Sequence, residues 1–169
     1  MDNISRHITY AEAIRSATAA RLGVSNTPST EHIVAMKRIA ERVFEPLRTY
    51  FGAPIEVGSF FRNPQVNAAI GGSATSQHMK GEAMDINKFA ASNYTNAELF
   101  WYIKERLEFD QLIWEFGTES EPDWVHVSLK ASNNRKQVLQ AYKASGVTKY
   151  RTFNLVKKIK DFVEEKKKS

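Results

Sequence analysis

The chain has 169 residues, enough for one compact domain, and its apolar and charged fractions of 42% and 25% are ordinary for a globular protein. It has no cysteine, which excludes disulfides, thiolate metal ligands and a cysteine nucleophile. The net charge of +5 favours anionic partners. Basic and aromatic residues do not interleave in a nucleic-acid-binding motif, and no apolar run is long enough to predict a membrane span.

The N-terminal part of the chain is predicted to be helical. A helix is expected over residues 10–21, ending at Gly23, because glycine readily adopts the left-handed conformation that follows a helix. A turn at 26–28 precedes a longer helix that begins near Ser29 and that Pro46 should kink or break. The apolar face of this second helix is formed by Ile33, Met36, Ile39, Val43 and Leu47.

The rest of the chain alternates short strands with helices. Strands are expected at 55–60, 83–86, 111–116 and 124–129, and a hairpin is expected over 137–150. Capping patterns at Asn63-Pro64 and at Thr95 predict helices to about residues 70 and 108. This mixture predicts an α+β fold, with helices packed on one face of a small, mainly antiparallel sheet. We expect a domain over 1–150 and a basic C-terminal helix and tail over 151–169.

The most informative segment is Ser76-Gln77-His78-Met79-Lys80-Gly81-Glu82-Ala83-Met84-Asp85. It places His78 seven residues before Asp85, with small residues between them, and His126 follows in a predicted strand. Two imidazoles and one carboxylate would supply three metal ligands. Three protein ligands with an open fourth position are typical of a catalytic zinc site, whereas structural zinc sites are closed by four ligands.

Hydrolysis at such a site also needs a general base and a positive group that stabilises the developing oxyanion. Asp123, three residues before His126, is the favoured base, with Glu119 and Glu121 as alternatives. Arg62 follows the predicted strand 55–60 and is a candidate to bind a substrate carboxylate or the oxyanion. A structural salt bridge is the alternative role for Arg62. The two remaining histidines, His7 and His32, are interpreted as structural.

The pattern Ser76, His78, Gly81, Ala83 and Asp85, followed by Asp123 and His126, resembles that of the D-alanyl-D-alanine metallopeptidase family. The family includes D-Ala-D-Ala carboxypeptidases, vancomycin-resistance dipeptidases and L-alanyl-D-glutamate endopeptidases of phage endolysins. The resemblance covers about residues 4–150 and is strongest to small phage and bacterial members. It implies that His78, Asp85 and His126 bind Zn²⁺, that Asp123 is the general base and that Arg62 assists the substrate or transition state. We expect Ser76, Gln77 and Trp124 to bind substrate.

The resemblance implies a zinc-dependent peptidase acting on peptidoglycan stem peptides, either as a D-Ala-D-Ala carboxypeptidase or as an L-Ala-D-Glu endopeptidase such as a phage endolysin. The alternative is a non-catalytic, zinc-stabilised module for cell-wall binding or virion structure, because Hedgehog signalling domains share the scaffold without established peptidase use. A monomer is expected. Without a signal-peptide pattern, the protein should be made in the cytoplasm and act at the wall after release or as a virion component. Phe60, where relatives often have glycine, is expected to narrow the cleft.

Overall fold

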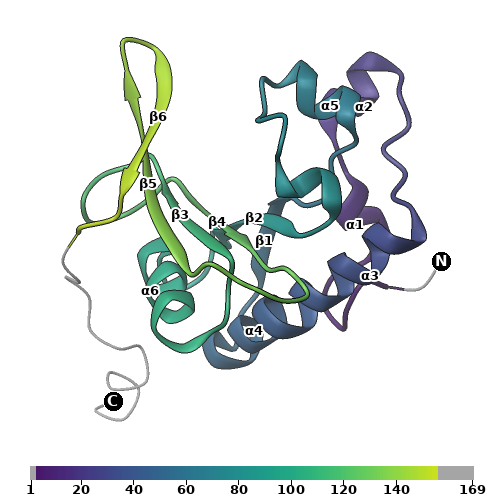
Figure 1. Cartoon of the computed structure of the whole chain (residues 1–169). Coiled ribbons are helices and arrows are strands. Elements are labelled where there is room, and N and C mark those ends of the chain that lie inside the picture. Colours follow the sequence, from purple (N-terminus) through teal and green to yellow (C-terminus); the bar gives the residue numbers. More distant parts are fainter. Residues whose placement is uncertain (1–2, 156–169) are drawn as a thin grey trace.

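A computed structural model describes residues 3–155, so most of the expected C-terminal helix lies outside the described residues. The described part contains a six-stranded sheet in the order β1-β2-β4-β3-β5-β6 (Figure 1). Its strands are β1 (Ile55–Ser59), β2 (Ala83–Lys88), β3 (Gln111–Glu115), β4 (Trp124–Ser128), β5 (Gln137–Ala144) and β6 (Val147–Thr152). Neighbouring strands are antiparallel except β3 and β5, which are parallel. The prediction of a mainly antiparallel sheet is confirmed.

The first predicted helix is divided in two, so the expectation of one helix over 10–21 is wrong. The segments are α1 (Tyr10–Ile14) and α2 (Ala17–Leu22), and Arg15 between them is extended at φ −61° and ψ 128°. The Ser16 hydroxyl accepts a hydrogen bond from the Ala19 backbone N–H and thereby caps α2. Serine side chains compete with the helix for backbone donors in this way, which favours a new helix start over continuation.

The second predicted helix continues past its proline without breaking, with a change of helix type just before it. It comprises α3 (Thr30–Ile39), the π-helical turn η1 (Ala40–Phe44) and α4 (Glu45–Phe51). Pro46 lies in the first turn of α4 and has no N–H to donate, and the widened turn η1 directly precedes it. Four residues of the predicted apolar face are fully buried and Ile33 is partly buried; the four are Met36, Ile39, Val43 and Leu47.

Two of the remaining helices, α5 (Pro64–Ala69) and α6 (Asn96–Arg106), begin where their caps predict. A 3₁₀ turn that was not predicted, η2 (Gln77–Lys80), carries His78. Asn63 accepts the Val66 backbone N–H at 2.7 Å, and Thr95 forms a capping box with Glu98. Helix α6 packs against β2, β3 and β4, and α4 packs against α6, so both cover one face of the sheet (Figure 1). Within the described residues, no helix combines the length and apolarity that crossing a membrane requires.

The two faces of the sheet have different side chains because successive residues of a strand alternate. On β4, Val125 and Val127 are fully buried in the core beneath the helices, so His126 belongs to the other face. Register partners share a face, which adds Asp85 on β2 and Ile113 on β3. We call this second surface the site face.

The end of the described chain is part of this architecture. β6 runs to Thr152, and the Phe153 ring packs 5.6 Å from the Trp114 ring in the core. The division into a domain over 1–150 and a tail over 151–169 stays a prediction, because residues 156–169 are outside the described range.

Candidate metal centre and active site

The structure brings together the three predicted metal ligands. One ligand atom from each of His78, Asp85 and His126 lies within 4.8 Å of the others. The Asp85 Oδ1 is 3.3 Å from the His78 Nε2 and 2.9 Å from the His126 Nδ1. Asp85 and His126 are register partners on neighbouring strands, so the pairing of β2 with β4 alone sets their approach.

These distances suit a shared metal ion. Zinc bonds to nitrogen and oxygen are roughly 2.0–2.2 Å long, so ligands at two corners of a tetrahedron lie about 3.3 Å apart. Both contacts of Asp85 are close to that spacing. The His78 Nε2 is also buried without a hydrogen-bond partner among the described residues, although it lies 3.3 Å from the Asp85 Oδ1. A cation between the two groups would satisfy both.

A hydrogen bond on the side of the ring away from Asp85 fixes the orientation of His78. Its Nδ1 lies 2.7 Å from the Phe60 carbonyl oxygen, which accepts hydrogen bonds and does not donate them. The proton of the neutral ring is therefore on Nδ1, and the Nε2 lone pair faces Asp85. A hydrogen bond of this kind, from the non-ligating nitrogen to a carbonyl, is the usual support of a metal-binding histidine.

The turn that carries His78 needs glycine at its end. Gly81 closes η2 at φ +69°, a conformation that side chains rarely adopt. A Cβ at this position would also meet the His32 carbonyl oxygen at 2.6 Å. Gly81 therefore lets the turn pack against α3 while the Arg62 N–H donates to the His78 carbonyl at 3.2 Å.

The protonation states of the cluster suit ligation. Burial lowers the pKa of His78, so its ring is neutral near pH 7. Burial by itself raises the pKa of Asp85, but the adjoining imidazoles His78 and His126 outweigh it and hold that pKa well below its usual range. A neutral imidazole and an ionised carboxylate are the forms that bind metal.

Arg62 extends into this charged environment from the end of β1. Burial lowers the pKa of its guanidinium, and the negative charges of Asp85 and Glu115 oppose that shift. Its Nε is buried and has no hydrogen-bond partner among the described residues. A buried cationic donor without a partner is costly, and binding an anionic or carbonyl oxygen of a ligand would offset that cost.

Glu115 is a site residue that was missed in the sequence. It ends β3 on the site face and is 7% exposed. Its register partner is Trp124, which makes it the diagonal neighbour of His126, with Cα atoms about 7–8 Å apart in such pairs. Burial, together with the charge of Asp85, raises the pKa of Glu115 to about 7. The signal for it was a carboxylate at the end of an otherwise apolar strand.

Asp123, the base predicted from the sequence, has a different environment. It directly precedes β4 and is exposed. Its backbone N–H donates to the Glu115 carbonyl at 2.9 Å, and its carbonyl accepts from the Asn96 side chain at 3.0 Å. Its role as general base stays a prediction. Glu115, a buried carboxylate on the same side of the sheet as the cluster, is a second candidate.

The residues predicted to bind substrate are near the cluster in sequence and partly exposed. Ser76 directly precedes η2, and Gln77 begins it with its side-chain amide donating to Glu82 at 3.3 Å. Trp124 shares the site face with His126, and its ring contacts the Phe116 ring at 5.4 Å between centroids in a tilted arrangement. Substrate contacts for these three residues stay a prediction.

The Phe60 ring does not narrow a substrate cleft, although we expected this because similar proteins often have glycine at this position. Its side chain is 1% exposed and belongs to the hydrophobic core. The carbonyl of this residue, and not its ring, faces the cluster and accepts the His78 proton. Phe60 directly follows β1, and the register shift between Val57 and Ser59 reverses the alternation, so that the ring of residue 60 turns toward the core.

The other two histidines have structural contacts, in keeping with their interpretation. The His7 Nδ1 lies 2.6 Å from the Glu45 carboxylate. The His32 Nδ1 accepts the Ser29 backbone N–H at 3.2 Å and completes the capping box of α3. Neither residue belongs to the metal cluster.

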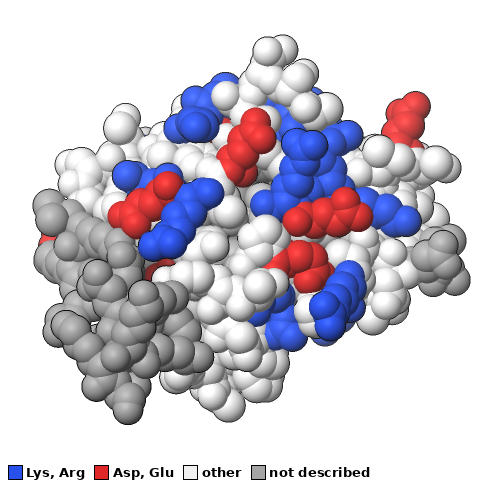
Figure 2. Space-filling model, turned by 90° about the horizontal axis from the view of Figure 1, so that it is seen from below, with Lys and Arg blue, Asp and Glu red and all other residues white. Residues whose placement is uncertain are grey.

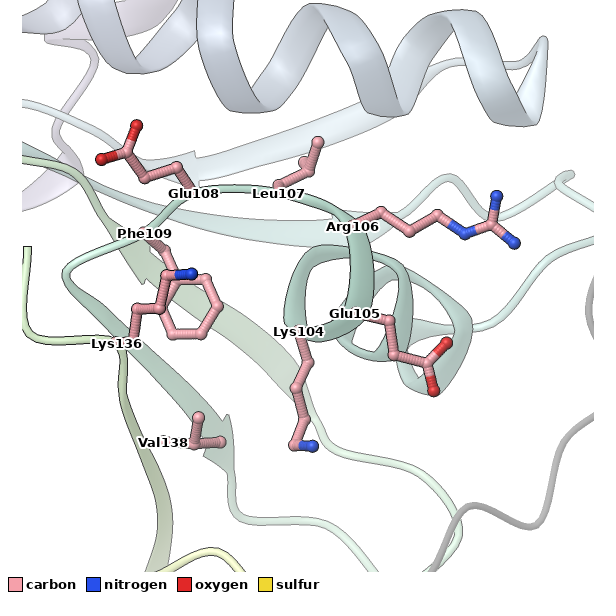
Figure 3. Close-up of a pocket in the computed structure, with 8 residues that line it drawn as sticks. All are labelled: Lys104, Glu105, Arg106, Leu107, Glu108, Phe109, Lys136 and Val138. Carbon is pink, nitrogen blue, oxygen red and sulfur yellow. The ribbon is translucent and has the colours of Figure 1, made fainter.

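A hollow of about 440 Å³ lies elsewhere, at the C-terminal end of α6 (Figure 3). Its lining combines charges of both signs with apolar groups: Lys104, Glu105, Arg106, Leu107, Glu108, Phe109, Lys136 and Val138. Val138 packs against the core, so the hollow is on the helix-covered side of the sheet. Figure 2 likewise shows acidic side chains interspersed among the basic ones on the surface that it presents. No metal ligand lines this hollow.

Comparison with known families agrees with the geometry. A family model described as Peptidase M15 matches residues 6–128. Among curated proteins, no match to the chain is found. The matched region contains the His–Asp–His cluster, Arg62 and Glu115, and it ends before the β5–β6 hairpin. Because the match spans well over half of the sequence, the chain belongs to the peptidase M15 family, the D-Ala-D-Ala metallopeptidases.

Proposed function

We propose that this metallopeptidase is zinc-dependent and hydrolyses the stem peptides of peptidoglycan. The family supports the peptidase activity, and the donor set of two imidazoles and one carboxylate supports zinc over a harder cation such as Mg²⁺. The observation that carries the proposal is the orientation of His78. Its Nδ1–H donates to the Phe60 carbonyl, so the lone pair of its buried Nε2 and the Asp85 carboxylate are directed at the same place, where a metal ion could bind.

His78, Asp85 and His126 would hold the ion. Zinc in such a site lowers the pKa of a water molecule to about 7 and so supplies hydroxide at neutral pH. Glu115 would accept the proton of the attacking water and pass it to the leaving amine. A general base needs a pKa nearer the working pH than that of a free carboxylate. In the metal-free protein burial raises the pKa of Glu115 to about 7, and a bound zinc ion would lower it from there. Arg62 would stabilise the oxyanion or bind a substrate carboxylate.

The base is thus proposed to be Glu115, with Asp123 as the competing candidate. Glu115 is buried on the site face and shares electrostatic interactions with Asp85, His126 and Arg62. Asp123 is exposed and closer in sequence to His126. Proton transfer needs hydrogen-bond reach to the water, directly or through one more water. As a diagonal neighbour of His126, Glu115 lies on the face of the sheet from which such an approach would be made.

The substrate class rests on the family and on charge. Stem peptides carry carboxylates that suit the Arg62 guanidinium, whose buried Nε has no partner among the described residues, and the net charge of +5. Carboxypeptidase action on D-Ala-D-Ala and endopeptidase action at L-Ala-D-Glu, as in a phage endolysin, use the same hydrolytic groups. Either activity would require the protein to reach the wall after release or as part of a virion.

The test is digestion of purified peptidoglycan by the zinc-loaded full chain, with the products identified by mass spectrometry. Loss of one terminal D-alanine would identify a carboxypeptidase, and stem peptides cut after L-alanine would identify an endopeptidase. Glu115→Gln should lower the rate by roughly 10²- to 10⁴-fold, and Asp123→Asn is the matched amide control. The reverse ranking of these two variants would make Asp123 the base.

The second candidate is a wall-binding or virion module whose zinc only stabilises the fold. It predicts bound zinc, no product from several wall types, and no functional difference between Glu115→Gln and wild type. The buried, unpartnered Nε of Arg62 argues against it, because a purely structural site has no need of such a group.

A further inference from the structure

A row of register partners crosses four strands on the site face. Trp124 on β4 pairs with Glu115 on β3, Glu115 with Ala141 on β5, and Ala141 with Tyr150 on β6. Register partners share a face of the sheet, so all four side chains emerge on the same side as the cluster. The row therefore connects the site to the β5–β6 hairpin, which projects beyond the neighbouring strands (Figure 1).

The small residue in this row lets the phenol come close to the site. Ala141, between Glu115 and Tyr150, carries one methyl group and is 1% exposed. Neighbouring strands are about 4.8 Å apart, so the Tyr150 backbone lies about 10 Å from that of Glu115. The ring can bridge much of that distance across Ala141.

Tyr150 is open to a ligand as well. It is 54% exposed, and its hydroxyl has no hydrogen-bond partner among the described residues. Partial burial raises the pKa of its phenol, and the negative charges of Glu115 and Asp85 raise it further, while Arg62 lowers it. The phenol is thus protonated near neutral pH, when it can donate a hydrogen bond.

The sheet order places the cluster between two candidate substrate contacts. Arg62 follows β1 at one edge, Asp85, His126 and Glu115 occupy the central strands, and Tyr150 lies on β6 at the other edge. The match to the family ends at residue 128, so Tyr150 belongs to a part of the chain outside it. A contact from this hairpin would add a specificity element outside the matched region.

We propose that Tyr150 is a substrate-binding residue, whose hydroxyl donates a hydrogen bond to a carbonyl or carboxylate oxygen of an acidic peptide on the β6 side of the cluster. Arg62 holds the same peptide on the β1 side. The proposal rests on the peptidase function proposed above. It deepens that function by assigning a specificity role to the hairpin.

The experiment measures kcat and KM on a synthetic stem peptide that contains both L-Ala-D-Glu and D-Ala-D-Ala. One neutral hydrogen bond corresponds to roughly a fivefold change, so Tyr150→Phe should raise KM by roughly 5-fold with little change in kcat. Tyr150→Ala should raise KM at least as much, because the ring contact is lost too. Zinc content and Tm should match those of wild type.

Tyr142→Phe is the matched control. Tyr142 is on the same hairpin, but it follows Ala141 and so emerges on the opposite face, where Arg151 lies 5.1 Å over its ring. This variant should leave kcat and KM unchanged. An equal rise in KM for Tyr142→Phe would mean that the hairpin acts only through its stability, and an unchanged KM for both Tyr150 variants would also overturn the proposal.

Failure of the proposed function gives a separate result. If wild type does not hydrolyse the peptide, its binding can be measured directly by calorimetry. A Kd that rises roughly 5-fold in Tyr150→Phe would then support the Tyr150 contact while the peptidase proposal fails. A Kd that does not depend on Tyr150, or no binding at all, overturns the contact.

Discussion

Two carboxylates in this chain, Asp85 and Asp110, both sit among positive or potentially positive groups and both have a lowered pKa. The carboxylate of Asp110 is fully paired within the protein, and we call Asp110 with Arg135 and Lys130 the closed cluster. The Asp110 side chain is 0% exposed and accepts from the Arg135 backbone N–H, Nε and Nη2 at 2.9, 3.1 and 2.6 Å, with the Lys130 Nζ at 3.2 Å. Around Asp85 the His78 Nε2 and, nearby, the Arg62 Nε have no hydrogen-bond partner among the described residues.

The difference separates a structural charge cluster from a functional one. Buried polar atoms are nearly always paired when their only task is stability, as those of Asp110 are. Among the described residues four buried side-chain atoms lack a partner: the Arg48 Nη1 of α4, the Asn67 Oδ1 of α5, and the His78 Nε2 and Arg62 Nε. The occurrence of two of the four around Asp85 favours a ligand or ion that completes them. The same type of residue therefore has opposite roles according to whether its neighbours are satisfied without an added partner.

The largest expected effect is on zinc binding by His78, Asp85 and His126, which we call the open cluster. Asp85→Asn keeps the size of the side chain but removes the ligand charge, so zinc affinity should fall by more than about 100-fold, beyond the loss typical of outer-shell changes. Wild type should gain about 4 kcal/mol in the free energy of unfolding when zinc is a thousandfold above its Kd, and the variant should not. Unfolding curves with zinc and with a chelator measure this. An equal zinc response in the two proteins would contradict the assignment of the ligand.

A substitution in the closed cluster should lower the free energy of unfolding without changing zinc binding. Asp110→Asn removes the charge that the half-exposed Arg135 side chain pairs with, and it weakens the hydrogen bonds to a fully buried carboxylate. The cost should be about 2–3 kcal/mol, because hydrogen bonds to charged groups are worth more than neutral ones. Denaturant unfolding measures the cost. Zinc binding by the folded fraction should equal that of wild type, and a parallel loss of zinc would mean that the two clusters are not independent.

Glu115 should give the metal-free protein a distinctive pH dependence. Its pKa is raised from 4.5 to about 7 on folding, so the folded state favours the protonated form. That contribution is fully present below pH 4.5 and is lost as the pH rises through 7, by about 3 kcal/mol in the free energy of unfolding. Glu115→Gln should flatten this part of the curve in chelator. Identical slopes for variant and wild type would refute the buried state of the carboxylate.

The smallest effect is expected at the rim of the closed cluster. Lys130 is 33% exposed in its side chain, and without it Asp110 still accepts hydrogen bonds from three donor atoms of Arg135. Lys130→Met should therefore cost no more than about 1 kcal/mol. A much larger cost in denaturant unfolding would show that Lys130 and Arg135 share the charge of Asp110 equally.

Local signals in the sequence predicted the parts of the fold that local physics controls. Asn63-Pro64 and the Thr95 capping box each begin a helix, and Gly23 ends one at φ 64°. The break at Arg15 was missed because a serine cap competes with helix continuation, and neither option dominates the local pattern.

The pairing of strands that are distant in sequence determines which further residues lie beside the three metal-ligand candidates. The three metal-ligand candidates came from a motif, and nearness to His126 in sequence singled out Asp123. Glu115 is brought beside them only by the register of β3 on β4, and Tyr150 only by the parallel pairing of β5 with β3. Such pairings between distant segments are not encoded in any short stretch of residues.

The parallel pairing of β5 with β3 also protects the chain from self-association. Without the β5–β6 hairpin, β3 would become an edge strand with a row of open N–H and C=O groups, and its residues Leu112, Ile113 and Trp114 are buried and apolar. Exposed, flat, apolar edges recruit strands from other molecules. A shortened chain ending at the family boundary of residue 128 would therefore keep all three metal-ligand candidates and still tend to aggregate.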